Sequence, residues 1–174
     1  MKSSQRILMI LAALIGVAFI AIFIFQKTNN SSIALSEQWI VSDVADGDTL
    51  TVRQTDGSQM QVQLCGIDVP ELIQGKPSTQ ALANEAFKKL RSLVATADNQ
   101  VIIIPVRKDS EGRTIAEVMA YGKNDMEISF QEELLKNGLA KIHESGIKCP
   151  NHSTFEQAQK IAIASKAGMW KQSN

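Results

Sequence analysis

A run of 19 apolar residues, from Ile7 to Phe25, sets the N-terminal end of the chain apart from any globular core. As a helix the run is roughly 28 Å long, close to the thickness of the hydrocarbon layer of a bilayer. A cleaved signal peptide has a shorter apolar region of about 7 to 15 residues and a small-x-small exit. Because this run ends in Phe23-Ile24-Phe25-Gln26, we expect a transmembrane signal anchor over residues 7–25 that is not cleaved.

The charges on either side of the run predict its orientation. Lys2 and Arg6 precede the run together with the amino terminus, whereas Lys27 is the nearest basic residue behind it. Basic residues favour the cytoplasmic side of a membrane-spanning segment. We therefore expect a single-pass membrane protein with residues 1–6 in the cytoplasm and its domain on the extracytoplasmic side.

The chain after the anchor has the composition of a short linker followed by one domain. Residues 26–36 are polar and rich in Ser and Asn, as is typical of flexible tethers. Residues 37–174, about 138 in number, have the size of a single domain. With Lys2 and Arg6 set aside, 16 basic and 18 acidic side chains remain. Because affinity for nucleic acid comes largely from Lys and Arg contacts to phosphate, we expect any such binding to be local and weak.

Hydrophobic periodicity predicts short strands with helices between and after them. The clearest alternation lies at 59–66, where Met60, Val62 and Leu64 point to one side and polar residues to the other. Strands are predicted at 39–45, 50–54, 59–66, 101–106 and 115–121, and helices at 78–95, with Ser78 as N-cap, 129–136 and 154–167. This mixed α and β pattern fits an OB-type barrel.

Three short motifs carry residues suited to phosphodiester chemistry: VADGDTL at 44–50, GIDVPE at 66–71 and GRT at 112–114. Taken singly, each is first of all a turn or loop signal. Taken together, they predict a metal-assisted site. In that site Asp48 and Asp68 hold a hard cation, Glu71 activates a water molecule, and Arg113 neutralises a phosphate.

The order and spacing of these motifs resemble those of the staphylococcal nuclease (thermonuclease-like) family from about Trp39 to Trp170. Besides the three motifs above, the matching stretches are Leu64-Cys65, Gly75-Lys76, Ala116-Glu117-Val118, Asn137-Gly138-Leu139-Ala140 and Gly168-Met169-Trp170. The resemblance implies a five-stranded OB-type β-barrel with about three α-helices. It also implies a calcium-dependent nuclease with its site on one face of the barrel.

The resemblance also implies a role for each site residue. Asp48 and Asp68 match the metal-ligating carboxylates, and the backbone carbonyl of Val69 is a third ligand. Calcium suits mixed carboxylate, carbonyl and water oxygens. Glu71 matches the general base, and Arg113 matches one of two phosphate-binding arginines.

The chain departs from the family pattern at several substrate positions. Gln63 stands five residues before Asp68, where the family has its other arginine, and a neutral amide is a weaker donor than a charged one. Ser110 and Glu111 follow Asp109 where a Lys and a Tyr are expected, and residues 142–151 lack two expected tyrosines. Weaker chemistry and weaker base stacking are therefore expected.

Two residue types leave alternatives open. Cys65 and Cys149 are the only cysteines. Outside the cytoplasm they are a disulfide candidate, whereas the alternative is a buried Cys65 and an exposed Cys149. His143 and His152 have no metal-ligand spacing around them, so both are interpreted as polar surface or loop residues.

The function we expect is that of a membrane-anchored, calcium-dependent hydrolase that cleaves phosphodiester bonds of DNA or RNA. The substrate is expected to bind weakly and the protein to be a monomer. The alternative is a catalytically weakened OB-fold module that binds single-stranded nucleic acid or another anionic polymer, which Gln63 and the lack of positive charge favour. A purely structural domain would not need Asp48, Asp68, Glu71 and Arg113 together.

Overall fold

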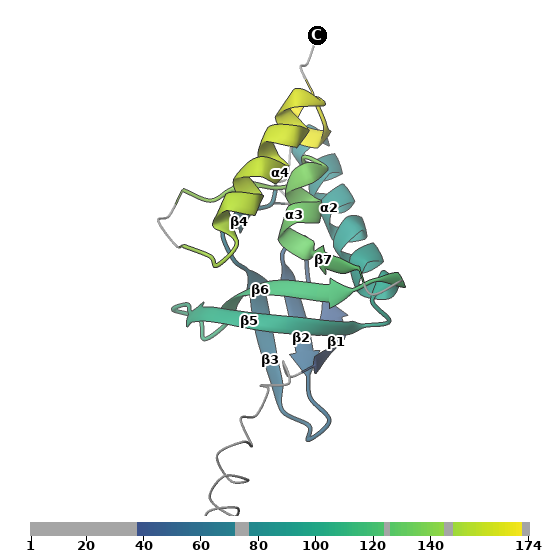
Figure 1. Cartoon of the computed structure of the whole chain (residues 1–174), viewed down its shortest axis with the longest axis vertical. Helices are drawn as coiled ribbons and strands as arrows, with labels where there is room; N and C mark the ends of the chain where they lie inside the picture. Colours follow the sequence, from purple (N-terminus) through teal and green to yellow (C-terminus); the bar gives the residue numbers. More distant parts are fainter. Residues whose placement is uncertain (1–37, 72–76, 124–125, 145–147, 172–174) are drawn as a thin grey trace, which may run out of the picture. The chain divides into compact units, whose positions relative to one another are not determined.

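The computed structural model of the chain describes residues 38–71, 77–123, 126–144 and 148–171 (Figure 1). The predicted anchor, the linker and the Gly75-Lys76 stretch lie outside these residues. None of the helices in the described ranges combines the length and the apolar character that a membrane span requires.

Five strands form a closed barrel in the order β3-β2-β1-β5-β6, because β6 pairs with β3 as well as with β5. The strands of the barrel are β1 Gln38–Val44, β2 Thr49–Arg53, β3 Gln59–Leu64, β5 Gln100–Lys108 and β6 Thr114–Tyr121. All neighbours are antiparallel except β3 and β6, which run parallel. The expected five-stranded barrel is confirmed.

Three short strands were not predicted. β7, Glu127–Ser129, extends the sheet at β6, while β4, Ile67–Asp68, pairs with β8, Lys141–Ile142. Segments of two or three residues show no periodicity in the sequence, and their partners are distant in the chain. The β4–β8 pair contains Asp68, one of the predicted site residues.

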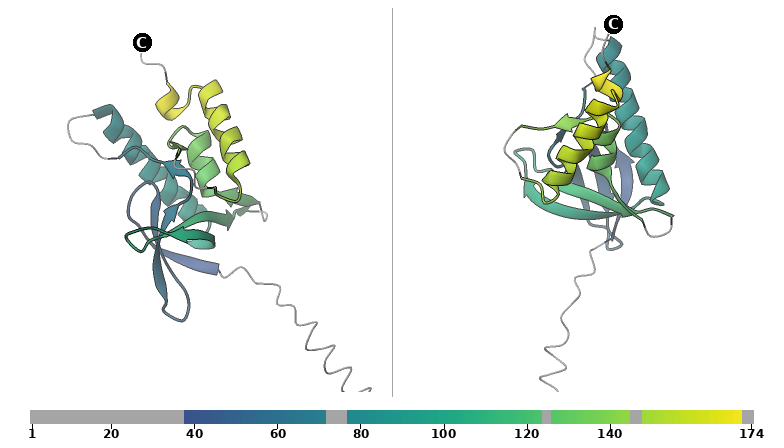
Figure 2. Two further views of the ribbon diagram at one scale, coloured as in Figure 1. Left: turned by 90° about the vertical axis from the view of Figure 1, so that its left-hand side faces the viewer. Right: turned by 45° about the horizontal axis from the view of Figure 1, so that its top comes forward.

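Three α-helices gather on one side of the barrel (Figure 1). They are α2 Pro77–Thr96, α3 Phe130–Lys136 and α4 His152–Ala164, and a short 3-10 helix η2 follows at Gly168–Trp170. Figure 2 shows α3 between the other two helices. The predicted number of helices is therefore confirmed.

Three predicted boundaries need correction. α2 already includes Pro77, so Ser78 lies in its first turn and not at the cap; proline is favoured at that first position. β3 ends at Leu64, before Gly66, whose φ of 73° turns the chain toward β4. α4 ends at Ala164, and Lys166 then takes a left-handed φ of 53°.

The apolar faces of the barrel and of all three helices meet in one core. Its fully buried side chains include Leu50, Val52, Val62, Leu64, Leu90, Val101, Phe130, Leu134, Leu135 and Phe155. Within the predicted alternation, Val62 and Leu64 are buried and Met60 packs against the core.

A disulfide joins the end of β3 to the loop before α4. Cys65 and Cys149 are bonded, are 84 residues apart in the sequence, and are both buried. Gly66 packs directly against this bond, since a Cβ at that position would lie 2.6 Å from Cys149 Sγ. The bond therefore links the segment that leads to Asp68 with the C-terminal helix.

A buried carboxylate anchors the same loop. Glu117 on β6 is 1% exposed and accepts hydrogen bonds from the backbone and the side-chain amide of Asn151, both at 2.7 Å. Hydrogen bonds to a buried charged group contribute more than neutral ones, about 1.5 to 3 kcal/mol each.

We expect Glu117→Ala to lower the free energy of unfolding by about 3 kcal/mol, because two donors of Asn151 lose their acceptor inside the protein. Urea unfolding with the disulfide intact measures the change. Glu85→Ala, on the exposed side of α2, is the matched control. Equal unfolding midpoints for the two variants would contradict this role of Glu117.

Candidate active site

One cleft of about 990 Å³ contains every residue of the predicted site. The turn between β1 and β2 contributes Asp48, β3 contributes Gln63, and the β5–β6 loop contributes Arg113. The segment at and after β4 contributes Asp68, Val69 and Glu71. Glu111, at a substrate position of the family, also lines the cleft, as do Asp46, Thr79, Ala83, Asn84, Phe87 and Lys141, which were not predicted as site residues.

Asp48 is positioned by a tight turn between β1 and β2. Its backbone N–H donates to Asp46 Oδ1 at 2.9 Å, and Thr49 Oγ1 donates to Asp48 Oδ1 at 3.0 Å. Gly47 allows this turn to pack closely, since a Cβ there would lie 2.6 Å from Val69 Cγ1 and 3.0 Å from Ala86 on α2. The turn that carries Asp48 therefore packs against Val69 and α2.

Burial raises the pKa of Asp48 from 3.8 to about 7. The neighbouring Asp46 adds to this increase through a hydrogen bond and its negative charge, while hydrogen bonds from Thr49 and Gln63 oppose it. The charged form of Asp48 is therefore costly in the protein alone. A bound cation would offset that cost.

Gln63 lines the cleft and its side chain hydrogen-bonds to Asp48. It pairs with Thr49 on β2 and with Ile115 on β6, and its side chain helps to keep Asp48 ionised. The residue at the position of the expected arginine thus faces the site. Arg53, further along β2, is exposed and does not line the cleft.

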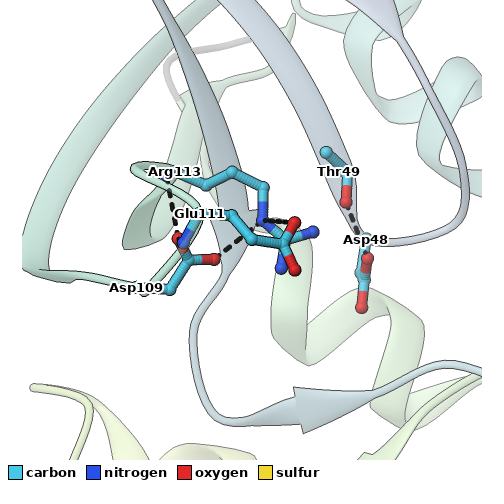
Figure 3. Close-up of polar contacts among 5 residues, drawn as sticks. All are labelled: Asp48, Thr49, Asp109, Glu111 and Arg113. Atoms are coloured by element: carbon cyan, nitrogen blue, oxygen red, sulfur yellow. Dashed lines mark hydrogen bonds and ion pairs between the residues drawn. The ribbon is translucent and has the colours of Figure 1, made fainter.

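The β5–β6 loop holds the guanidinium of Arg113 between carboxylates (Figure 3). Asp109 accepts hydrogen bonds from Arg113 Nε at 2.7 Å and from its backbone N–H at 2.9 Å. Glu111 Oε2 lies 3.7 Å from the same Nε. Glu111, which stands where a tyrosine was expected, therefore adds negative charge beside Arg113.

These contacts shift the pKa values of both partners. Desolvation opposes ionisation of Asp109, but hydrogen bonds from Arg113 and Glu111 outweigh it and lower the pKa of Asp109. Hydrogen bonding to Asp109 raises the pKa of Arg113 above its ordinary value, and the charges of Glu111 and Asp48 act in the same direction. Arg113 therefore stays cationic and fixed.

Asp68 on β4 contacts two basic side chains, that of Lys141 on β8 and that of His143, which directly follows β8. His143 Nδ1 lies 2.5 Å from Asp68 Oδ1, and Lys141 Nζ lies 3.9 Å from Asp68 Oδ2. His143 is at the surface as predicted, but its contact with Asp68 was missed. No local sequence pattern predicts the contact between His143 and Asp68, because the contact depends on the pairing of β4 with β8.

Glu71 lies at the rim of the cleft, three residues after Asp68, and is exposed. Val69 and Pro70 connect it to β4 and also line the cleft. The carboxylate is thus accessible to water on the same side as Asp48 and Arg113.

Comparison with known proteins agrees with this geometry. A model of the family described as staphylococcal nuclease homologue matches residues 61–172. The chain belongs to the staphylococcal nuclease family. It is 31% identical to a thermonuclease of Staphylococcus hyicus, with 83% of this chain and 82% of the relative covered.

Two further relatives extend the family comparison. A thermonuclease of Staphylococcus intermedius is 27% identical, with 87% and 91% of the two chains covered. A protein of Komagataella phaffii named "Probable endonuclease LCL3" is 30% identical, with 68% of this chain and 52% of the relative covered. The staphylococcal nuclease match begins within β3 and ends at residue 172, so it includes every predicted site residue except Asp48.

Within the staphylococcal nuclease domain, the carboxylates of the cleft do not form a preassembled cage. Among the described residues, no three His, Cys, Asp or Glu side chains are close enough together to hold a metal ion. Asp48 and Asp68 share the cleft as two separate oxygen donors. This donor set fits a cation that accepts carbonyl and water oxygens as well, as calcium does.

We expect Asp48→Asn to stabilise the protein in the absence of divalent cations at pH 8, by up to about 4 kcal/mol. The folded-state pKa of Asp48 is raised to about 7, so stability is lost as pH rises from about 4 to about 7. The neutral Asn avoids that loss, and the gain disappears near pH 4. Urea unfolding in a chelator at both pH values measures it, with exposed Asp43→Asn as control. A gain of equal size at both pH values would rule out this origin.

Proposed function

We propose that this protein is a calcium-dependent nuclease that hydrolyses phosphodiester bonds of DNA or RNA on the extracytoplasmic side of a membrane, where residues 7–25 anchor it. The observation that supports the proposal best is the convergence of Asp48, Asp68, Glu71 and Arg113 on one cleft. These residues come from three separate parts of the chain. Family membership supports the same class of reaction.

Asp48, Asp68 and the backbone carbonyl of Val69 are the proposed calcium ligands. The raised pKa of Asp48, caused by burial and by the nearby Asp46, supports a cation at this point. When bound, calcium would lower the pKa of a coordinated water and offset negative charge on the phosphate.

Glu71 and Arg113 are the proposed catalytic residues. The exposed carboxylate of Glu71 accepts a proton from the attacking water molecule. Arg113 donates to phosphoryl oxygens from the guanidinium nitrogens that Asp109 does not use, since Asp109 accepts from Nε. Its planar group matches a phosphate, and Asp109 fixes its orientation.

Two features favour slow chemistry and are the basis of the competing proposal, a module that binds single-stranded nucleic acid without cutting it. Gln63 supplies no charge next to Asp48, and Glu111 competes with phosphate for Arg113. We place the enzyme first because both proposed catalytic residues line the same cleft.

The membrane location rests on the apolar run and on the buried disulfide. Disulfides persist in oxidising compartments and are rare in the cytoplasm, so the Cys65–Cys149 bond fits a domain outside it. The positive charges before residue 7 support the same orientation.

The full chain, purified in a mild detergent, is expected to cleave single-stranded DNA or RNA slowly with calcium. Glu71→Gln is expected to reduce the rate about 10²- to 10⁴-fold and Arg113→Ala about 10²- to 10³-fold. Glu85→Gln and Arg53→Ala, which lie away from the cleft, are the matched controls. Single-turnover rates at saturating calcium measure the effect. Equal rates for site variants and controls would refute the assigned roles, and binding without cleavage by the parent would favour the binding module.

Protein recovered from membranes is expected to retain residues 1–25, because the apolar run is long and has no small-x-small exit. N-terminal sequencing of the membrane fraction measures this directly. A chain that starts after Phe25 would show a cleaved signal peptide and contradict the anchor.

A further inference from the structure

The cleft carries more negative than positive charge, although its proposed substrate is a polyanion. Among the described residues that line it, five are acidic, namely Asp46, Asp48, Asp68, Glu71 and Glu111. The basic ones in the same described set are Arg113 and Lys141. A calcium ion offsets part of this excess, but phosphate contacts still require cationic side chains.

Arg113 is already engaged by two carboxylates. Its Nε donates to Asp109 at 2.7 Å and lies 3.7 Å from Glu111. The charge that Arg113 presents to a phosphate is therefore partly neutralised. A second cation in the cleft would have a large effect on binding.

The backbone of Lys141 is fixed at the cleft, whereas its ammonium group is accessible to solvent. It pairs with Asp68 across the β4–β8 ladder, and the adjacent Ile142 N–H donates to Gln159 Oε1 on α4 at 2.7 Å. The side chain of Lys141 is 57% exposed, and Nζ lies 3.9 Å from Asp68 Oδ2. An exposed pair at this distance contributes little to stability.

Asp68 also has a closer partner than Lys141. His143 Nδ1 lies 2.5 Å from the other oxygen of the carboxylate. Asp68 therefore does not depend on Lys141 for a polar contact, and the ammonium group can move to a substrate without leaving the carboxylate alone.

We propose that Lys141 binds a substrate phosphate and supplies the second positive charge of the cleft. The assignment rests on the proposed nuclease function and goes beyond it by naming a further substrate-binding residue. The four-carbon stem of Lys141 lets Nζ exchange its distant contact with Asp68 for a phosphate oxygen. Gln63, which faces the same cleft, can donate a hydrogen bond to a phosphate but adds no positive charge.

The test is binding of a short fluorescent single-stranded oligothymidylate by the full chain in detergent, with calcium and a Glu71→Gln background that prevents cleavage. Lys141→Gln is expected to weaken binding about three- to tenfold at low salt. It is also expected to make the slope of log affinity against log salt shallower by about 0.7, the loss of one phosphate contact. Lys160→Gln on the exposed side of α4 is the charge-matched control and should leave both quantities unchanged.

Two rescue variants separate a lost charge from a disturbed structure. Lys141→Arg, and Gln63→Arg added to Lys141→Gln, should each restore most of the affinity and of the salt slope. Equal affinity and slope for Lys141→Gln and Lys160→Gln would overturn the assignment, as would a loss that neither rescue variant restores. If the Glu71→Gln protein binds no oligonucleotide and the parent cleaves none, the proposed function itself fails, and the role of Lys141 with it.

Discussion

The barrel depends on the parallel pairing of β3 with β6, over Val62–Leu64 and Thr114–Ala116. Without this pairing the sheet would be open, with unpaired backbone groups along β3. The same pairing brings the β5–β6 loop next to the first hairpin, so that Arg113 faces Gln63 and Asp48. Closure of the barrel thus creates the cleft, and the positions of its residues follow from the register of the strands.

The charge arrangement of the cleft lowers the stability of the protein when no cation is bound. Asp48 is partly buried beside Asp46, and burial together with this neighbour raises its pKa to about 7. Negative charges at short range destabilise the protein when nothing is bound, and they favour the binding of a cation. Such a conflict between local stability and charge placement is common at functional sites.

The sequence predicted the long elements and a set of residues that share one cleft, because both have local signals. The alternation around Val62 and the motifs around Asp48, Asp68 and Arg113 are readable within a few residues. The contacts of Asp68 with Lys141 and His143 were not predicted, since they arise from a two-residue strand pair between distant segments. The same holds for Glu117 and Asn151, whose contact joins β6 to the loop before α4 across a separation of 34 residues.

The link between Cys65 and Cys149, and the pairing of β4 with β8, also bear on the order in which the protein is made. Asp68 is synthesised before its strand partner Lys141, and Cys65, which precedes it, is synthesised 84 residues before its disulfide partner Cys149. A nascent chain that stops before residue 141 contains all five barrel strands and both proposed calcium-binding carboxylates, but it lacks the strand partner of Asp68 and the disulfide partner of Cys65. Assembly of the cleft therefore requires synthesis of the chain at least through Cys149, and shorter translation products lack an assembled site.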